Sequence, residues 1–83
     1  MYRVSIEKKV LKQLEKLPRQ DYLKLKRAIN LLAQNPRPQG CKKLEGRAGY
    51  RIRVGDYRVI YEIRDDILAV FILAAGHRKN IYN

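Results

Sequence analysis

The chain has 83 residues, 46% of them hydrophobic and 33% charged, a composition typical of one small folded domain and not of a disordered segment. Its 19 Lys and Arg outnumber its 8 Asp and Glu, so the formal net charge is +11 and attraction to polyanions is expected. No stretch approaches the roughly 20 apolar residues of a membrane span. We therefore predict a single domain over residues 1–83 that binds nucleic acid or an acidic protein and no membrane. The single Cys41 excludes an internal disulfide and fits a reducing compartment, so a cytoplasmic protein is expected.

The N-terminal half predicts one short strand followed by two helices. Residues 2–6 alternate between apolar and polar side chains, as in a strand, and Ser5 is a candidate N-cap for the helix that follows. Apolar residues then recur at helical spacing in two stripes separated by Pro18, namely Val10, Leu11, Leu14 and Leu17, then Tyr22, Leu25, Ile29 and Leu32. The second helix is expected over about residues 19–34, and the short link favours an antiparallel helical hairpin.

Residues 50–61 predict a β-hairpin, because apolar and basic residues alternate on both sides of the turn signal Gly55-Asp56. The register that follows pairs Val54 with Tyr57, Arg53 with Arg58, Ile52 with Val59, Arg51 with Ile60 and Tyr50 with Tyr61. Paired residues share a face of the sheet. One face is therefore apolar and faces the core, whereas the other carries Arg51, Arg53 and Arg58.

The arginine face has two interpretations. Like charges directly opposite each other destabilise a sheet, and a bound anion such as phosphate would relieve the repulsion between Arg53 and Arg58. Alternatively, this is a basic face that water solvates. Three arginines on one small patch favour the phosphate site.

The remaining segments complete an α+β domain. Residues 42–46 are expected to be a loop or a short extended piece, and Asp65-Asp66 a two-residue turn. The apolar run 67–75 predicts a strand at or near the centre of the sheet, in which Leu73 pairs with Arg58. The predicted order is β-α-α-β-β-β, with a helical hairpin packed on one face of a small, largely antiparallel sheet.

These residues together resemble the RelE/ParE superfamily of toxins from toxin–antitoxin pairs, and the RelE branch in particular. The resemblance covers essentially the whole chain. It is carried by the strand and helical hairpin, Lys43-Leu44-x-Gly46, Tyr50-Arg-Ile-Arg53, Asp56-Tyr-Arg58-Val-Ile-Tyr61 and Gly76-His-Arg78-x-x-Ile-Tyr82. It implies a ribosome-dependent endonuclease that cuts mRNA in the ribosomal A site, a cognate antitoxin as partner, and no small-molecule cofactor.

The resemblance also implies the site residues. The family's two basic positions on the first hairpin strand fall on Arg51 and Arg53, where well-known members often have lysines. The arginine of the second strand falls on Arg58, and the tail residues fall on Arg78 and Tyr82. His77 and Lys43 are auxiliary candidates.

The chemistry of RNA fits these residue types without a metal. The 2′-hydroxyl of RNA is the nucleophile, so cleavage needs a base, stabilisation of the phosphate and protonation of the leaving 5′-oxygen. Guanidinium groups suit the phosphate but stay protonated, which leaves the base to His77 or Tyr82. The resemblance favours Tyr82, although this ring could instead stack on a base. His77 could instead be a strand-end residue with its ring hydrogen-bonded to the backbone.

Two other functions remain open from the sequence. A ParE-like toxin would inhibit DNA gyrase and cut no RNA, and it would share the same fold. A non-catalytic RNA-binding module would bind RNA with a steep salt dependence and no cleavage. One Cys and one His cannot form a zinc site by themselves, so no metal is expected.

Overall fold

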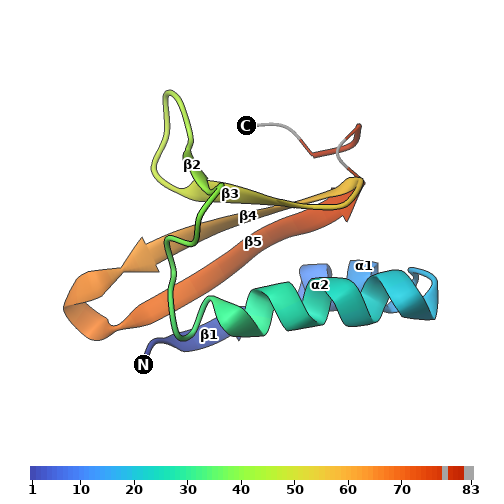
Figure 1. Ribbon diagram of the computed structural model, residues 1–83, viewed down its shortest axis with the longest axis horizontal. Helices are drawn as coiled ribbons and strands as arrows, with labels where there is room; N and C mark the ends of the chain where they lie inside the picture. The colour runs from blue at the N-terminus through green and yellow to red at the C-terminus, as the bar shows by residue number, and fades with distance from the viewer. Residues whose placement is uncertain (78, 82–83) are drawn as a thin grey trace.

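The computed structural model describes residues 1–77 and 79–81 as two layers, a five-stranded sheet and a helical hairpin that covers one of its faces (Figure 1). In chain order the elements are β1 (Arg3–Ile6), α1 (Lys8–Glu15), α2 (Arg19–Leu31), β2 (Lys42–Lys43), β3 (Tyr50–Val54), β4 (Tyr57–Arg64), the 3₁₀ turn η1 (Asp65–Ile67) and β5 (Ala69–His77). The strand order is β1-β5-β4-β3-β2, with β1 parallel to β5 and the other neighbours antiparallel. The predicted α+β fold is confirmed.

The core lies between the sheet and the helices, as the two helical stripes predict, except that Leu11 of the first stripe is 38% exposed. It contains Val10, Leu14, Leu25, Ile29 and Leu32 from the helical hairpin and its end, and Ile52, Val59, Tyr61, Val70, Ile72 and Ala75 from the strands. Helix α1 packs on β5, and α2 packs on β3. In the described part of the chain, neither helix is long and apolar enough to cross a membrane.

The predicted register of the β3–β4 hairpin is confirmed in all five pairs. Gly55 has a φ of +62°, whereas Asp56 does not have a positive φ, which is the pattern of a two-residue turn with glycine in its first central position. Ile52, Val59 and Tyr61 are buried on the helix side. The arginines therefore lie on the side of the sheet that the helices do not cover.

The predicted turn before the last strand is wrong, and with it the predicted register of that strand. The connection continues beyond Asp65-Asp66 to Leu68, which adopts a left-handed conformation with a φ of +51°, and β5 then runs from Ala69 to His77. A β-bulge between Ile60 and Tyr61 of β4 adds one more residue on β5. As a result, Arg58 pairs with Gly76 and not with Leu73.

Two smaller expectations also change. Ser5 does not cap α1, because it is part of β1 and pairs with Phe71, and the helix begins one residue after Glu7. The segment after α2 contains a real edge strand, β2, in which Lys42 pairs with Arg51 and Lys43 with Tyr50. The sheet therefore has one strand more than predicted. The strand expected near the centre, β5, is indeed flanked on both sides, by β1 and β4.

Polar contacts hold the connection after α2 against the end of the sheet that is remote from Gly55. The buried hydroxyl of Tyr61 donates a hydrogen bond of 2.8 Å to the carbonyl of Pro36. Arg37 donates to the Asp65 carboxylate at 2.9 Å, and its guanidinium lies 5.3 Å from the ring centre of Tyr50. These contacts join the 35–40 connection to β3, β4 and η1.

Replacing Tyr61 with Phe should destabilise the protein. The change removes the donor to the Pro36 carbonyl and leaves this buried acceptor without its partner, which typically costs about 1–3 kcal/mol. Urea titration followed by circular dichroism would measure the free energy of unfolding. Tyr2→Phe, which removes a hydroxyl from the exposed Asp65 contact, is the control and should have the smaller effect. Equal losses in the two variants would contradict the assignment.

Asp65 should make the stability of the protein pH-dependent. Hydrogen bonds from Arg37 and then Tyr2 lower the pKa of this carboxyl below its usual value. A lowered pKa in the folded state means that the stabilisation is present above the unfolded pKa, about 3.9, and is lost as the pH falls through the folded pKa. Asp65→Asn should therefore lower the Tm at pH 7, with a difference from wild type that shrinks below about pH 4. A Tm difference that does not change with pH would argue against this linkage.

Candidate functional site

The three hairpin arginines come together on the uncovered side of the sheet, as predicted. Arg53 lies directly opposite Arg58, and Arg51 lies diagonally next to Arg58 because its own partner is Ile60. Directly paired positions have Cβ atoms about 5 Å apart, and diagonal neighbours are within reach of long side chains. Arg53 is exposed, whereas Arg51 and Arg58 are half-buried. We refer to Arg51, Arg53 and Arg58 as the arginine surface.

The neighbouring strands add to the positive charge of the arginine surface. Lys42 of β2 pairs with Arg51, so a lysine stands beside the arginines at the edge of the sheet. On the other side, Gly76 pairs with Arg58 and presents no side chain. Three arginines and a lysine therefore meet in one region, where guanidinium groups can bind the oxygens of a phosphate.

The segment after β5 turns back over the arginine surface. The Asn80 N–H donates to the His77 carbonyl at 2.8 Å, and the Ile81 side chain packs directly above Gly76. The Nη1 group of Arg58 donates to the Ile81 carbonyl at 3.1 Å. The tail thus begins beside the arginines, as expected, and one of its carbonyl groups orients Arg58. Arg78 and Tyr82, the two predicted tail residues, lie outside the described residues.

His77 lies on the other side of the sheet from the arginines. It pairs with Tyr57, and the two rings meet edge to face with centres 5.9 Å apart. The Nδ1 atom of His77 accepts a hydrogen bond of 3.3 Å from the Lys79 N–H. This geometry fits the alternative role of His77, a strand-end residue whose ring is hydrogen-bonded to the backbone, and it separates the ring from the arginine surface.

Tyr57 belongs to the same helix-side cluster as His77. Its hydroxyl donates a hydrogen bond of 2.7 Å to Asp21 in the first turn of α2. This bond to Asp21 raises the pKa of the Tyr57 hydroxyl, so the phenol stays neutral at physiological pH. The cluster ties the end of the hairpin to the helical layer.

Lys43, the other auxiliary candidate, is also separated from the arginines. Its partner Tyr50 faces the helix side of the sheet, so the register assigns Lys43 to that side as well. Its neighbour Lys42 takes the position next to Arg51. An edge strand of only two residues has too little alternation for the sequence to distinguish the two lysines.

Sequence reasoning missed two contributors to this region. Lys42 was hidden by the short edge strand, and the Ile81 carbonyl is a backbone group with no sequence signal. Ile60 is only 1% exposed although it lies on the arginine side. Its burial could have been expected from the sequence, because Ile60 is apolar whereas its neighbours on the same side of β4 are polar. In the described part of the chain, no group of three or more His, Cys, Asp or Glu residues could hold a metal ion.

Comparison with known proteins places this arrangement in a family. The sequence profile described as "ParE toxin of type II toxin-antitoxin system, parDE" matches residues 4–82. A protein named RelE1 from Methanocaldococcus jannaschii is 35% identical over 85 residues, which cover 98% of this chain and 94% of the relative.

Solved structures agree with the sequence matches. The archaeal RelE–RelB complex from Pyrococcus horikoshii OT3 contains a chain with a TM-score of 0.84 and 36% identity, covering 96% of this chain and 98% of that chain. The RelBE toxin–antitoxin complex of E. coli contains a chain with a TM-score of 0.80 and 26% identity, covering 93% and 96%. The chain described here belongs to the RelE/ParE family of toxins of type II toxin–antitoxin systems.

Proposed function

We propose that this toxin is a ribosome-dependent, metal-free endoribonuclease that cuts mRNA in the A site and so blocks translation in the cytoplasm. The observation that carries the proposal is the direct opposition of Arg53 and Arg58, with Arg51 beside them, on the side of the sheet that the helices leave uncovered. Arginines placed side by side on a sheet repel one another, and a bound phosphate would stabilise them. The net charge of +11 suits association with ribosomal RNA.

The proposed reaction uses the nucleophile that RNA itself supplies. The 2′-oxygen loses its proton and forms a bond to phosphorus, the bond from phosphorus to the 5′-oxygen breaks, and the leaving oxygen takes up a proton. The products are a 2′,3′-cyclic phosphate, which can open to a 3′-phosphate, and a 5′-hydroxyl. Arg51, Arg53 and Arg58 would stabilise the charge that develops on the phosphate oxygens.

The general base is assigned to the tail. We assign the general base to Tyr82, following the family resemblance, and a phosphate contact to Arg78. His77 is the weaker candidate for the base, because its ring packs on Tyr57 on the helix side of the sheet. Its bond to the Lys79 N–H suggests instead that His77 supports the start of the tail.

The proposed protein partner is a cognate antitoxin. The structures of the relatives from P. horikoshii and E. coli are complexes of RelE with RelB. By this similarity, we expect a partner with acidic and apolar segments that covers the arginine surface. Inspection of the neighbouring gene would provide the antitoxin for co-expression.

The second candidate is inhibition of DNA gyrase without RNA cleavage, which the match to the ParE profile favours. Cell-free translation with mapping of mRNA ends separates the two functions. Ribosome-dependent cuts within codons support the nuclease. Intact mRNA together with halted supercoiling by purified gyrase would overturn it in favour of the second candidate.

Arg58→Ala should abolish toxicity and lower the rate of mRNA cleavage by about 10²–10³-fold, since it removes one contact made to the transition state. The variant should keep its fold, because the change also relieves the repulsion from Arg53. Arg64→Ala is the matched control, since Arg64 lies on the same side of the same strand, six residues away, in an exposed ion pair with Asp66. If the Arg58→Ala variant unfolds, the arginine surface has a structural role. If the variant folds and keeps full activity, Arg58 does not belong to the site.

Binding to ribosomes or RNA should weaken with salt, with log K falling linearly with log salt concentration, because bound counterions are released from the phosphates. A variant that makes one phosphate contact fewer than wild type should have a slope that is smaller by about 1. Filter binding at several potassium chloride concentrations would measure the slope for wild type and for Arg53→Ala. An affinity that is the same at low and moderate ionic strength would contradict the electrostatic argument.

A further inference from the structure

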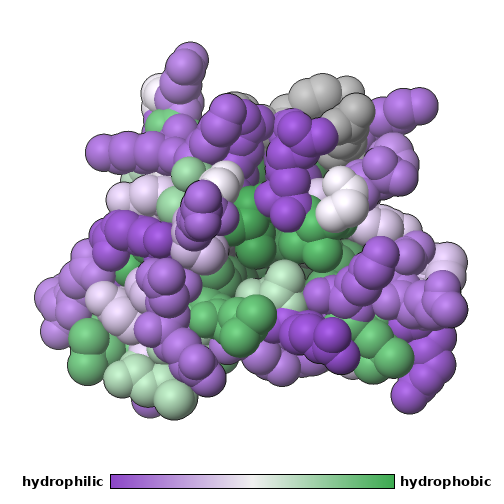
Figure 2. All heavy atoms as spheres, viewed as in Figure 1, coloured by the Kyte–Doolittle hydropathy of each residue, from purple (hydrophilic) through white to green (hydrophobic). Residues whose placement is uncertain are grey.

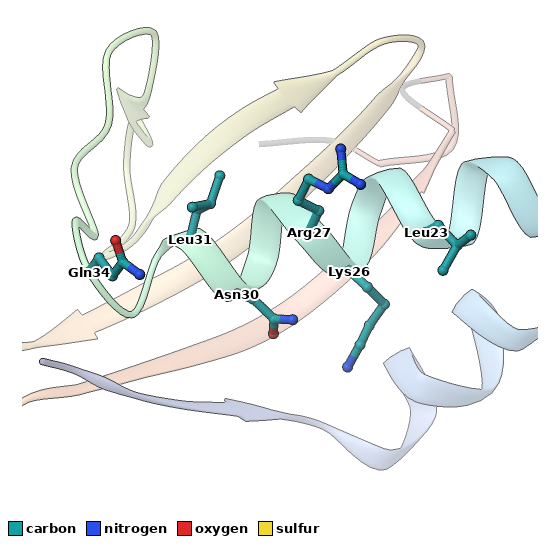
Figure 3. A pocket seen from close by; sticks show the side chains of 6 residues that line it. All are labelled: Leu23, Lys26, Arg27, Asn30, Leu31 and Gln34. Carbon is teal, nitrogen blue, oxygen red and sulfur yellow. The ribbon is translucent and has the colours of Figure 1, made fainter.

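Positive charge is spread over this protein, so a cation by itself does not define a binding site. Hydrophilic side chains cover much of the surface in Figure 2. On the helical layer, for example, Lys26 and Arg27 line a shallow hollow of α2 together with two leucines (Figure 3). Cations directly opposite each other on neighbouring strands are different, because they repel each other and an anion between them is stabilising. The described strand pairings contain two such pairs.

The second pair of opposed cations is Lys42 with Arg51, at the edge of the sheet. Lys42 of β2 is exposed and lies opposite Arg51 of β3, so the two side chains share the side that the helices do not cover. The first pair, Arg53 with Arg58, lies two residues further along β3. Strand geometry separates Arg51 from Arg53 by about 7 Å. This distance is close to the spacing of successive phosphates in one extended RNA strand.

The neighbouring side chains favour β2 as the place for a second phosphate. On the same side of β4, Arg58 is followed by Ile60, which is 1% exposed, and then by Glu62. An RNA strand that continued along β4 would therefore meet a buried apolar residue and a carboxylate. On the other flank of β3, the pair of Lys42 and Arg51 presents two cations. The charges thus lead from the arginines to the β2 edge.

We propose that Lys42 and Arg51 bind a second phosphate of the mRNA, next to the scissile phosphate that Arg53 and Arg58 hold. This inference rests on the proposed nuclease function and deepens it, because it assigns a substrate contact to Lys42 and a path to the RNA strand. The strand would cross from β4 over β3 to the β2 edge, with successive phosphates at the two pairs. Arg51 lies diagonally next to Arg58 and so borders both phosphates.

Lys43 provides a matched control, because it differs from Lys42 mainly in the side of the sheet on which it lies. Both lysines are exposed residues of the same two-residue strand. Lys43 pairs with Tyr50, which packs against the core, so the register assigns Lys43 to the side away from the arginines. Lys26→Ala is a second control, since it removes the same charge from the helical layer (Figure 3). An effect that only Lys42→Ala produces therefore comes from position and not from net charge.

Cleavage of short synthetic mRNAs on purified ribosomes would test the proposal. Lys42→Ala should lower kcat/KM by about 10-fold, the usual size of one lost hydrogen bond to a charged group. The loss should appear in KM rather than in kcat, because the second phosphate does not react and is bound equally in the ground state and the transition state. Lys43→Ala and Lys26→Ala should change kcat/KM little, since salt screens isolated surface charges.

The decisive measurement is the coupling between Lys42 and a phosphate next to the cleaved one. Each neighbouring phosphate is replaced in turn by an uncharged methylphosphonate, in a linkage without its 2′-hydroxyl, and the 2′-deoxy phosphodiester is the reference. One of these replacements should lower kcat/KM of wild type and of Lys43→Ala by about 10-fold, but that of Lys42→Ala much less, since this variant already lacks the contact. Coupling on the 5′ or the 3′ side supports the proposal and gives the direction of the strand. If neither replacement couples to Lys42, the proposal is wrong.

The outcomes separate this inference from the proposed function. If wild type leaves mRNA intact on ribosomes, the proposed function fails and the second phosphate site fails with it. If wild type cleaves mRNA and Lys42→Ala cleaves it equally well, only the second phosphate site is wrong. Lys42→Gln, which keeps a long polar side chain at this exposed position, replaces the alanine variant if that variant does not fold, and the same losses and the same coupling are expected.

Discussion

The register of the β3–β4 hairpin is the constraint on which the rest of the structure depends. It places Arg53 directly against Arg58, an opposition of like charges that costs at most about 1 kcal/mol. The adjacent pair in the same register, Ile52 with Val59, is buried on the helix side, and each such side chain contributes about 1.5–3 kcal/mol. Burial of the apolar face therefore outweighs the repulsion on the other face. Packing of the helices on the apolar face thus keeps the arginines together on the other face.

The register of the β3–β4 hairpin also influences which residue of β5 lies opposite Arg58. Once Val59 faces the core, Arg58 must face away from it, and the bulge in the β4–β5 pairing then brings Gly76 opposite Arg58. A residue with a side chain at position 76 would meet the side chain of Ile81, with contacts of 3.3 Å to a Cβ atom. Glycine leaves room for the tail to return over the sheet and for the Ile81 carbonyl to accept a hydrogen bond from Arg58.

The parts of the fold that could be predicted from the sequence are those set by residues close together in the chain. A Gly-Asp turn between alternating residues determines every pair of the hairpin, and two apolar stripes determine which helix faces are buried. The connection after Asp65 could not be predicted, because Leu68 adopts a left-handed conformation that a residue with a Cβ rarely takes. That error, together with the β-bulge, moved the partner of Arg58 from Leu73 to Gly76. The separation of His77 from the arginines also depends on this register, so sequence alone left both roles of His77 open.

The positive charge of this chain is best understood through what surrounds each group of cations. On the arginine surface, three arginines occupy opposite and diagonal positions beside Gly76, a setting that suits phosphate oxygens. On α2, Lys24, Lys26 and Arg27 flank two exposed leucines on the helical layer. The core separates these two groups of cations, and the antitoxin expected over the arginine surface would compete there with a bound nucleic acid. Net charge attracts both kinds of partner.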